Sequence, residues 1–237
     1  MKRMATAILL FDFIAGLLLL GLYGLGSRTV AADSRMVYTA ENEEDWENLE
    51  REDVRKIAIT FDDGPHPSYT AQLLDGLKER GIQATFFVTG EHAELHPDII
   101  ERMFKEGHLI GNHTYSHIQL TKSNRDKFRD ELIKTNEILK EITGEEVQYV
   151  RPPYGSWDKS FEKELNMFPV LWTVDPLDWS SRNVGRITEK IVSKTGENDI
   201  ILMHDYYDTS VTAALKAIDK LLEEGYTFVT VEEILFD

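Results

Sequence analysis

Short apolar runs alternate along most of the chain with longer amphipathic segments. The short runs are rich in β-branched and aromatic residues and have the length of buried strands: IAITF, ATFFVTG, HLIGNH, VQYVRPPYG, PVLWTVD, DIILMHD and YTFVTV. The segments that follow them carry apolar residues at helical spacing: TAQLLDGLKERG, PDIIERMFKEG, KFRDELIKTNEILKEITG, residues 159–165, ITEKIVSKTG, VTAALKAIDKLLEEG and EEILF. Glycine follows five of these segments, where a left-handed C-cap favours it: Gly81, Gly107, Gly144, Gly196 and Gly225. The pattern predicts about seven strand-helix units.

This alternation predicts an α/β fold in which a parallel sheet has its helices outside. Periodicity alone fits both a closed barrel and an open doubly wound sheet. Unusual polar residues fall after the predicted strands: Asp62 and Asp63, His113 and His117, Arg151 and Tyr154, Asp175 and Asp178, and His204. In barrels of parallel strands, chemistry gathers at the carboxyl ends of the strands, whereas an open sheet would spread these ends apart. We therefore expect a barrel with one polar rim.

The N-terminal segment does not follow the alternation. Two basic residues precede an apolar run from about Ala5 to Leu25, and the small residues Val30-Ala31-Ala32 suit cleavage by signal peptidase. We expect residues 1–32 to be a signal peptide. Retention as an N-terminal membrane anchor is the alternative, because the run is long enough to span a bilayer. Either way we expect an exported protein, secreted or at the cell surface.

Composition narrows the possible partners and chemistry. Acidic residues dominate residues 33–54, which we expect to be a linker or a weak helix. The chain has 237 residues, of which 42% are hydrophobic, enough for one globular domain with an appended segment. Its net charge of -16 disfavours nucleic acid as a partner, since phosphate binding depends on clustered Lys and Arg. Cysteine is absent, which leaves histidine and carboxylate as the possible metal ligands.

The adjacent carboxylates Asp62 and Asp63 stand where a strand pattern gives way to Gly-Pro. Two such groups repel each other unless a cation lies nearby or one of them holds a proton. His113 and His117 are four residues apart, and this spacing predicts that both imidazoles lie on one side of a helical turn and hold one ion. A carboxylate as third ligand would leave positions open for water and substrate.

A divalent ion that binds a water molecule next to a second carboxylate, one that is not a metal ligand, forms a site that can catalyse hydrolysis. His204 is then placed to protonate a leaving group, with a structural histidine as the alternative. Arg151 is interpreted as a substrate clamp, as the partner of a buried base, or as plain loop packing. The sequence has no Gly-x-Ser-x-Gly elbow and no phosphate-cradling loop, which weakens serine-esterase and nucleotide-binding interpretations.

The four remaining histidines have no comparable spacing. We interpret His66, His92, His96 and His108 as surface or loop residues. His66 directly follows the Asp-Asp-Gly-Pro stretch, so among these four it is the one we expect nearest to a substrate.

Five motifs in order resemble those of the polysaccharide deacetylase family, the NodB-like carbohydrate esterases of the family 4 type. They are TFDDGP (60–65), HTYSH (113–117), RPPYG (151–155), DPLDW (175–179) and ILMH (201–204). The resemblance covers Arg55 to the C-terminus, which makes residues 55–237 the expected catalytic domain. It implies a distorted (β/α) barrel of about seven strand-helix units. It also implies a metal-dependent hydrolase that removes acetyl groups from N-acetylated sugars.

The resemblance also implies a role for each matching residue. Asp62 would be the general base, and Asp63 would bind the metal together with His113 and His117. The general acid would be His204, Arg151 would hold Asp62, and Asp178 would orient and tune His204. The backbone amide of Tyr154 would help to stabilise the oxyanion, while Trp179 and Leu202 would line the slot for the acetyl methyl group. Zinc is the usual metal in this family, and cobalt or manganese can replace it.

The expected partner is an N-acetylated polysaccharide or oligosaccharide, such as peptidoglycan or a chitin-like chain at a bacterial cell surface. We expect a monomer that contacts a membrane only through its N-terminal segment. Two alternatives remain open. One is an O-acetyl esterase that acts on xylan, because the same attack by water cleaves an ester. The other is a wall-binding protein that keeps the fold and the metal without turnover.

Overall fold

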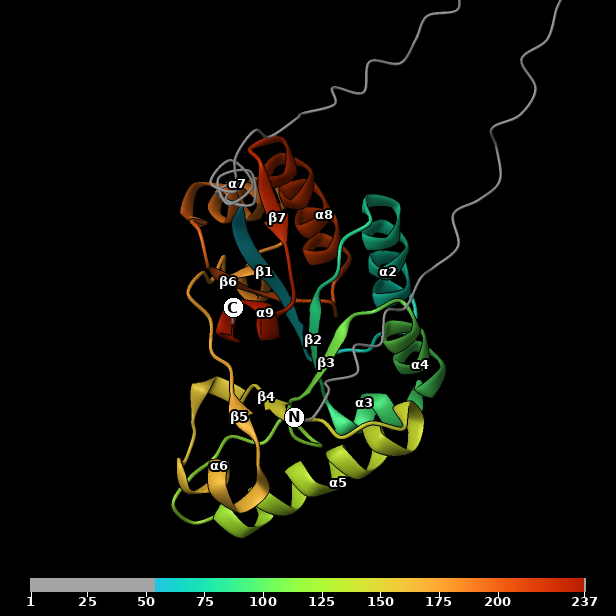
Figure 1. Ribbon diagram of the computed structural model, residues 1–237, viewed down its shortest axis with the longest axis vertical. Helices are drawn as coiled ribbons and strands as arrows, with labels where there is room; N and C mark the ends of the chain where they lie inside the picture. The colour runs from blue at the N-terminus through green and yellow to red at the C-terminus, as the bar shows by residue number, and fades with distance from the viewer. Residues whose placement is uncertain (1–53, 237) are drawn as a thin grey trace, which may run out of the picture. The chain divides into compact units, whose positions relative to one another are not determined.

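The computed structural model of the protein describes residues 54–236 (Figure 1). The predicted signal peptide or anchor at 1–32 lies outside these residues, as does nearly all of the predicted acidic linker. Among the described residues, no helix has both the length and the apolar character needed to cross a membrane.

Strands and helices alternate largely as the sequence pattern predicts, but the helix at Gly90–Leu95 was not predicted, so two helices lie between the second and third strands. The strands are β1 (Arg55–Asp62), β2 (Thr85–Val88), β3 (Leu109–Asn112), β4 (Tyr149–Val150), β5 (Phe168–Pro169), β6 (Ile200–His204) and β7 (Tyr226–Phe228). The α-helices are α2 (Tyr69–Arg80), α3 (Gly90–Leu95), α4 (Pro97–Lys105), α5 (Arg125–Thr143), α6 (Ser160–Leu165), α7 (Val184–Lys194), α8 (Asp208–Glu223) and α9 (Val231–Phe236). Two short 3-10 helices, η1 (Pro153–Gly155) and η2 (Asp178–Ser180), follow β4 and β5. The helices α8, α2, α4 and α5 lie in succession around the strands in Figure 1.

The strands form one parallel sheet in the order β5-β4-β3-β2-β1-β6, and β7 pairs with the beginning of β1. Val174, which follows β5 in the chain, forms a parallel bridge with Ile201 of β6, the strand at the opposite end of that order. The sheet therefore curls until its two edges approach each other. This distorted half-barrel of parallel strands confirms the predicted fold class.

Side chains along β1 point alternately to the interior of the curled sheet and to its outer face. Ile57, Ile59 and Phe61 belong to the large core cluster that the surrounding helices share. The residues between them face the interior, where Ala58 joins a second, smaller cluster. The same alternation turns Asp62 inward at the end of the strand, where it lies in register with His204 of β6. The carboxyl end of the interior is therefore polar.

Helix α9 closes the amino end of the interior. Val231 and Ile234 pack there with Ala58, Phe87 and Ile200. Backbone and side-chain hydrogen bonds fix the helix in place, with the Val231 N–H donating to Thr85 Oγ1 at 3.1 Å and the Tyr149 hydroxyl donating to Glu232 at 2.9 Å. This leaves the carboxyl ends of the strands as the open side of the sheet.

Four of the five predicted glycine positions have the expected left-handed backbone, and the fifth is wrong. Gly81, Gly107, Gly144 and Gly225 have φ between 64° and 83°. Gly196 has no positive φ, because α7 ends at Lys194 and continues into an extended Thr195. The Gly196 N–H instead donates to the Asp199 side chain at 2.6 Å.

Candidate functional site

A pocket of about 330 Å³ opens at the carboxyl ends of the strands. The residues that line it are Asp62, Asp63, His113, His117, Pro152, Tyr154, Trp172, Asp175, Trp179, Leu202 and His204. They include every residue that the sequence placed at the site except Arg151 and Asp178. These two are fully buried behind the pocket.

The two histidines of HTYSH do not share a helical turn, so that expectation is wrong. His113 follows β3 directly, and the chain then bends through a loop in which Thr114 and His117 have φ of 62° and 55°. These left-handed residues fold the loop back until the two imidazole centroids are 4.9 Å apart. The rings converge as predicted, but by a different backbone path.

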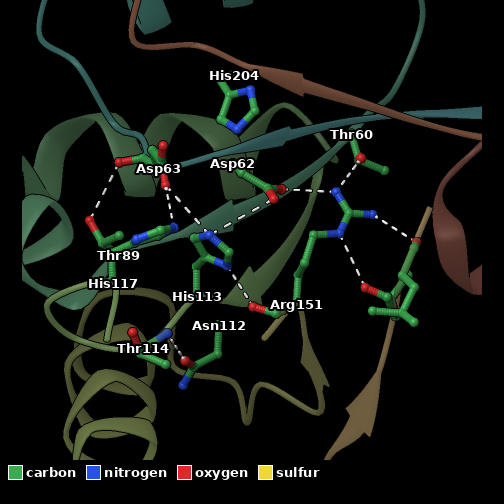
Figure 2. Close-up of polar contacts among 12 residues, drawn as sticks. Thr60, Asp62, Asp63, Thr89, Asn112, His113, Thr114, His117, Arg151 and His204 are labelled. Atoms are coloured by element: carbon green, nitrogen blue, oxygen red, sulfur yellow. Dashed lines mark hydrogen bonds and ion pairs between the residues drawn. The ribbon is translucent and has the colours of Figure 1, made fainter. Parts of the chain in front are cut away.

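Asp63 completes a three-residue cluster with the donor atoms of a metal site (Figure 2). Its Oδ1 lies 3.5 Å from His113 Nε2 and 3.5 Å from His117 Nε2. Two ligand atoms bound tetrahedrally at about 2.1 Å from one zinc ion are about 3.4 Å apart, so these distances fit a shared ion. The same Oδ1 is buried and has no hydrogen-bond partner among the described residues, as expected of an atom that awaits a cation.

The charges of the cluster also suit a metal. Burial by itself would raise the pKa of Asp63, but the neighbouring His113, with the charges of His204 and His117, lowers that pKa to about 2. Burial and the neighbouring His113 lower the pKa of His117. An ionised carboxylate and a neutral imidazole are the forms that bind a divalent cation.

Asp62 is held by Arg151 rather than by the histidines. Arg151 Nη1 donates to Asp62 Oδ1 at 2.8 Å and also to the Thr60 hydroxyl (Figure 2). The rest of the guanidinium donates to the carbonyls of Val170 and Leu171, both at 3.1 Å, and its carbon lies 4.2 Å from the Phe87 ring centroid. Because the arginine side chain is 0% exposed, it cannot clamp a substrate, and its interpretation as the partner of a buried carboxylate fits the geometry.

Arg151 also supports the candidate metal site formed by Asp63, His113 and His117. Its carbonyl lies 2.5 Å from His113 Nδ1, which leaves Nε2 as the nitrogen that points toward Asp63. A hydrogen bond of this kind fixes the tautomer and the ring orientation of a metal-binding histidine. Burial lowers the pKa of the Arg151 guanidinium, and the Asp62 carboxylate counteracts that effect.

His204 ends β6 and lines the same pocket as His117. The buried Asp178 of η2 accepts two hydrogen bonds from this histidine, from its backbone N–H and from its Nδ1, each at 2.9 Å. Burial disfavours the charged ring, but Asp178, with Asp62 and Asp63, raises the pKa of His204 to about 9. The ring is therefore an acid that can donate from Nε2 at neutral pH.

Tyr154, Trp179 and Leu202 line the pocket. Tyr154 lies in η1 with φ of 58° and is 67% exposed, whereas Trp179 is 53% exposed. Leu202 is buried at the inner wall of the pocket. Two aromatic side chains thus stand at the opening above a small apolar floor.

The sequence did not predict the surroundings of three further polar residues, of which His108 lies at the amino end of β3 and outside the pocket. His108 is wrong as a surface residue, since it is buried and its Nδ1 accepts the Ala84 N–H at 3.1 Å; burial lowers its pKa to about 4. His92 Nδ1 lies 2.7 Å from the Asp63 carbonyl. Asp205 is fully buried, accepts a hydrogen bond from the Thr70 hydroxyl, and has its pKa raised to about 7 by burial. Only its place beside His204 could have indicated Asp205.

A family model described as "Polysaccharide deacetylase" matches residues 50–170. The chain is 41% identical over 178 residues to the peptidoglycan-N-acetylmuramic acid deacetylase PdaC of Bacillus subtilis, covering 75% of this chain and 38% of that protein. It is also 41% identical over 182 residues to a peptidoglycan-N-acetylglucosamine deacetylase of Bacillus cereus, covering 74% of this chain and 66% of that protein. The solved structure of Bacillus subtilis PdaC matches with a TM-score of 0.74 and 40% identity, over 76% of this chain and 90% of the solved one.

Proposed function

Because this chain belongs to the polysaccharide deacetylase family, we propose that it is a metal-dependent hydrolase that removes N-acetyl groups from N-acetylglucosamine units of a cell-wall or chitin-like polysaccharide. One observation carries the proposal: the two adjacent carboxylates have different partners. Asp63 lies 3.5 Å from each of two imidazoles, while Asp62 is bound by a buried arginine. A site with one carboxylate for a metal and one for a proton can hydrolyse an amide.

The metal would be held by Asp63, His113 and His117. A divalent ion bound there would lower the pKa of a bound water and stabilise negative charge on the acetyl carbonyl oxygen. One carboxylate and two imidazoles suit zinc, and cobalt or manganese also accept such ligands.

Asp62 would act as the general base. Its Oδ2 lies 3.8 Å from His113 Nε2, so the carboxylate is beside the metal cluster without belonging to it. Arg151 occupies Oδ1 and fixes the plane of the carboxylate, which directs the other oxygen toward the pocket. As the water oxygen attacks the carbonyl carbon, Asp62 takes one of the water's protons.

His204 would act as the general acid. When the bond between the carbonyl carbon and the amide nitrogen breaks, the nitrogen needs a proton to leave as an amine. His204 Nε2 supplies it, while Asp178 holds Nδ1 and stabilises the charged ring beforehand. The products are acetate and a free amine on the sugar.

The remaining pocket residues would bind the acetyl group. The backbone N–H of Tyr154 would donate to the carbonyl oxygen as it gains charge, the role of an oxyanion hole. Trp179 and Leu202 would enclose the methyl group, and their apolar surfaces at the pocket support this assignment.

The relatives support peptidoglycan as the proposed substrate. Both relatives named above are peptidoglycan deacetylases, so peptidoglycan is the first polymer to test, with chitooligosaccharides second. We also propose that the protein is exported and works as a monomer, and a wall substrate is consistent with the proposed export.

Release of acetate tests the proposal. Full-length protein, supplied with zinc, cobalt or manganese, should release acetate from peptidoglycan or chitooligosaccharides, as measured by an enzyme-coupled acetate assay. Release from acetylated xylan alone would replace the deacetylase with an O-acetyl esterase. No release from any of these polymers would leave a protein that binds the wall without turnover.

A further inference from the structure

The two histidines of the metal cluster are held in different ways. The His113 ring is buried, its Nδ1 lies 2.5 Å from the Arg151 carbonyl, and its backbone N–H donates to the Val88 carbonyl at 2.9 Å. A metal-binding histidine usually has its second ring nitrogen held by such an acceptor. The orientation of His113 is therefore fixed through its own side chain.

His117 has no equivalent support. Among residues 54–236, its ring forms no hydrogen bond to a carbonyl or a carboxylate other than the contact with Asp63, and its side chain is 35% exposed. Its ring lies beside the rings of His113 and Tyr154, with centroids 4.9 and 5.1 Å away. The direction of this imidazole must therefore be set by the backbone of the loop, where His117 itself is left-handed.

Glu131 of α5 binds this loop at the residue just before His117. The Ser116 N–H donates to Glu131 Oε2 at 2.9 Å, and the Ser116 hydroxyl donates to Oε1 at 2.8 Å. Both carboxylate oxygens are thus used by one residue. Within the part of the chain that the structure describes, the ion pair of Glu131 is with Lys127, whose Nζ lies 3.9 Å from Oε1 and whose side chain is 67% exposed, so Glu131 is not chiefly an ion-pair partner.

Helix α5 can act as a fixed support because it is tied to the strand that precedes the loop. The Asn112 side chain at the end of β3 donates to the Leu132 carbonyl at 2.9 Å, and its oxygen accepts the Thr114 N–H at 2.7 Å. Asn112 thus holds the start of the loop and the helix together. Glu131, next to Leu132 on that helix, holds the other end.

We propose that Glu131 is a positioning residue for the metal ligand His117. By clamping Ser116, it holds the left-handed backbone that turns the His117 imidazole toward Asp63, in place of the hydrogen bond that His117 lacks. This inference rests on the metal centre of the proposed function, but not on the identity of the substrate. Removing the clamp should weaken metal binding while leaving the rest of the fold in place.

Zinc affinity of the full chain, measured by competition with a chromophoric chelator, tests the clamp directly. We expect Glu131→Ala to lower the affinity about tenfold, the lower end of the loss when an outer partner of a metal ligand is removed. Glu131→Gln should keep more of the affinity, because its amide can still accept from the Ser116 N–H and donate to the hydroxyl. The matched control is Glu137→Gln, an exposed position on the same helix, which should bind zinc as the wild type does.

Glu131→Asp provides a second variant in case the alanine variant does not fold. It keeps the charge, but it is one methylene shorter and cannot reach both groups of Ser116 at their present distances. Wild-type zinc affinity in Glu131→Asp and Glu131→Ala, even with a lowered melting temperature, would reduce Glu131 to structural support and overturn the proposal. Weakened zinc binding in these variants, with no acetate release from the zinc-loaded wild type, would support the clamp and contradict the proposed function instead.

Discussion

At the amino end of the curled sheet, Ala58 of β1 and Ile200 of β6 pack against Val231 of α9 in an apolar layer, whereas at the carboxyl end the same two strands finish in Asp62 and His204. Along both strands the alternation of side chains is unbroken, so the same inward positions change from apolar to charged within one strand. The apolar layer at the amino end stabilises the curl of the sheet. The layer at the carboxyl end can be polar because the curl of the sheet brings its charged side chains close to one another.

The backbone differs between the two ends as well. Among residues 54–236, seven non-glycine residues have positive φ, and five of them lie in the loops that follow strands: Asp63, Thr114, His117, Tyr154 and Leu177. The other two, Asn166 and Asn198, precede strands and belong to a residue type that tolerates this conformation. Strain of this kind persists where surrounding contacts hold it, often at functional sites. Here it is concentrated where side chains must converge.

His204→Ala should have the largest effect, at the polar end. Loss of a general acid typically lowers turnover by about 10² to 10⁴-fold, and we expect kcat to fall by about 10³-fold. Zinc affinity and KM should stay near their wild-type values, because His204 does not belong to the metal cluster. Steady-state kinetics with chelator competition would check both, and an unchanged kcat would rule out the acid role.

Ile200→Ala tests the apolar end. Removing most of this buried side chain should lower the free energy of unfolding by about 2 to 3 kcal/mol, as cavity-creating changes in a core do. Zinc affinity of the folded protein should not change, since this apolar layer lies at the amino end of the sheet and the site lies at the carboxyl end. Denaturant unfolding and zinc titration at 25 °C would measure the two quantities. A tenfold loss of zinc affinity would show that the two ends are coupled rather than separable.

Asp178→Asn should shift the pH profile with little change at its optimum. Asp178 raises the pKa of His204 to about 9, and the protonated ring is the acid, so wild-type kcat/KM should fall as pH rises through about 9. Without the carboxylate, this alkaline limb should move toward the ordinary imidazole value of about 6.5. The stability that the charged His204 contributes should likewise be full below about pH 6.5 and disappear as pH rises through about 9.

The exposed Asp98→Asn provides the control for that profile, because it changes the same charge on α4, away from the pocket. Its alkaline limb should match that of the wild type. An Asp178→Asn limb that stays near pH 9 would assign the limb to another group.

The alternation of strands and helices and the polar rim at the carboxyl ends of the strands could be predicted from the sequence, since both follow from its pattern of apolar and polar positions. Asp62, His113 and His204 were found because they interrupt apolar runs at strand ends. The path between His113 and His117 could not be found, because a four-residue spacing favours a helix unless tertiary contacts impose another backbone. Those contacts come from Asn112 and from Glu131 on a distant helix.

Buried polar residues outside the motifs were missed for a related reason. His108 stands between Gly107 and Leu109, and Asp205 between His204 and Tyr206; only the packed structure shows that both polar side chains are buried. Likewise, Gly196 stands where a C-cap glycine is expected, but a hydrogen bond to Asp199 ends the segment differently. In each case the environment of the residue depends on a contact that the local sequence pattern does not predict.

In the proposed function Asp62 and Asp63 have separate roles, as base and as metal ligand, and one paired measurement tests this division most directly. Zinc content and acetate release should be determined for Asp62→Asn and Asp63→Ala under identical conditions. Asp62→Asn should retain zinc and lose most turnover, because it removes a base while keeping a side chain of the same shape beside Arg151. Asp63→Ala should lose the zinc itself. An equal loss of zinc in both variants would contradict the division of roles.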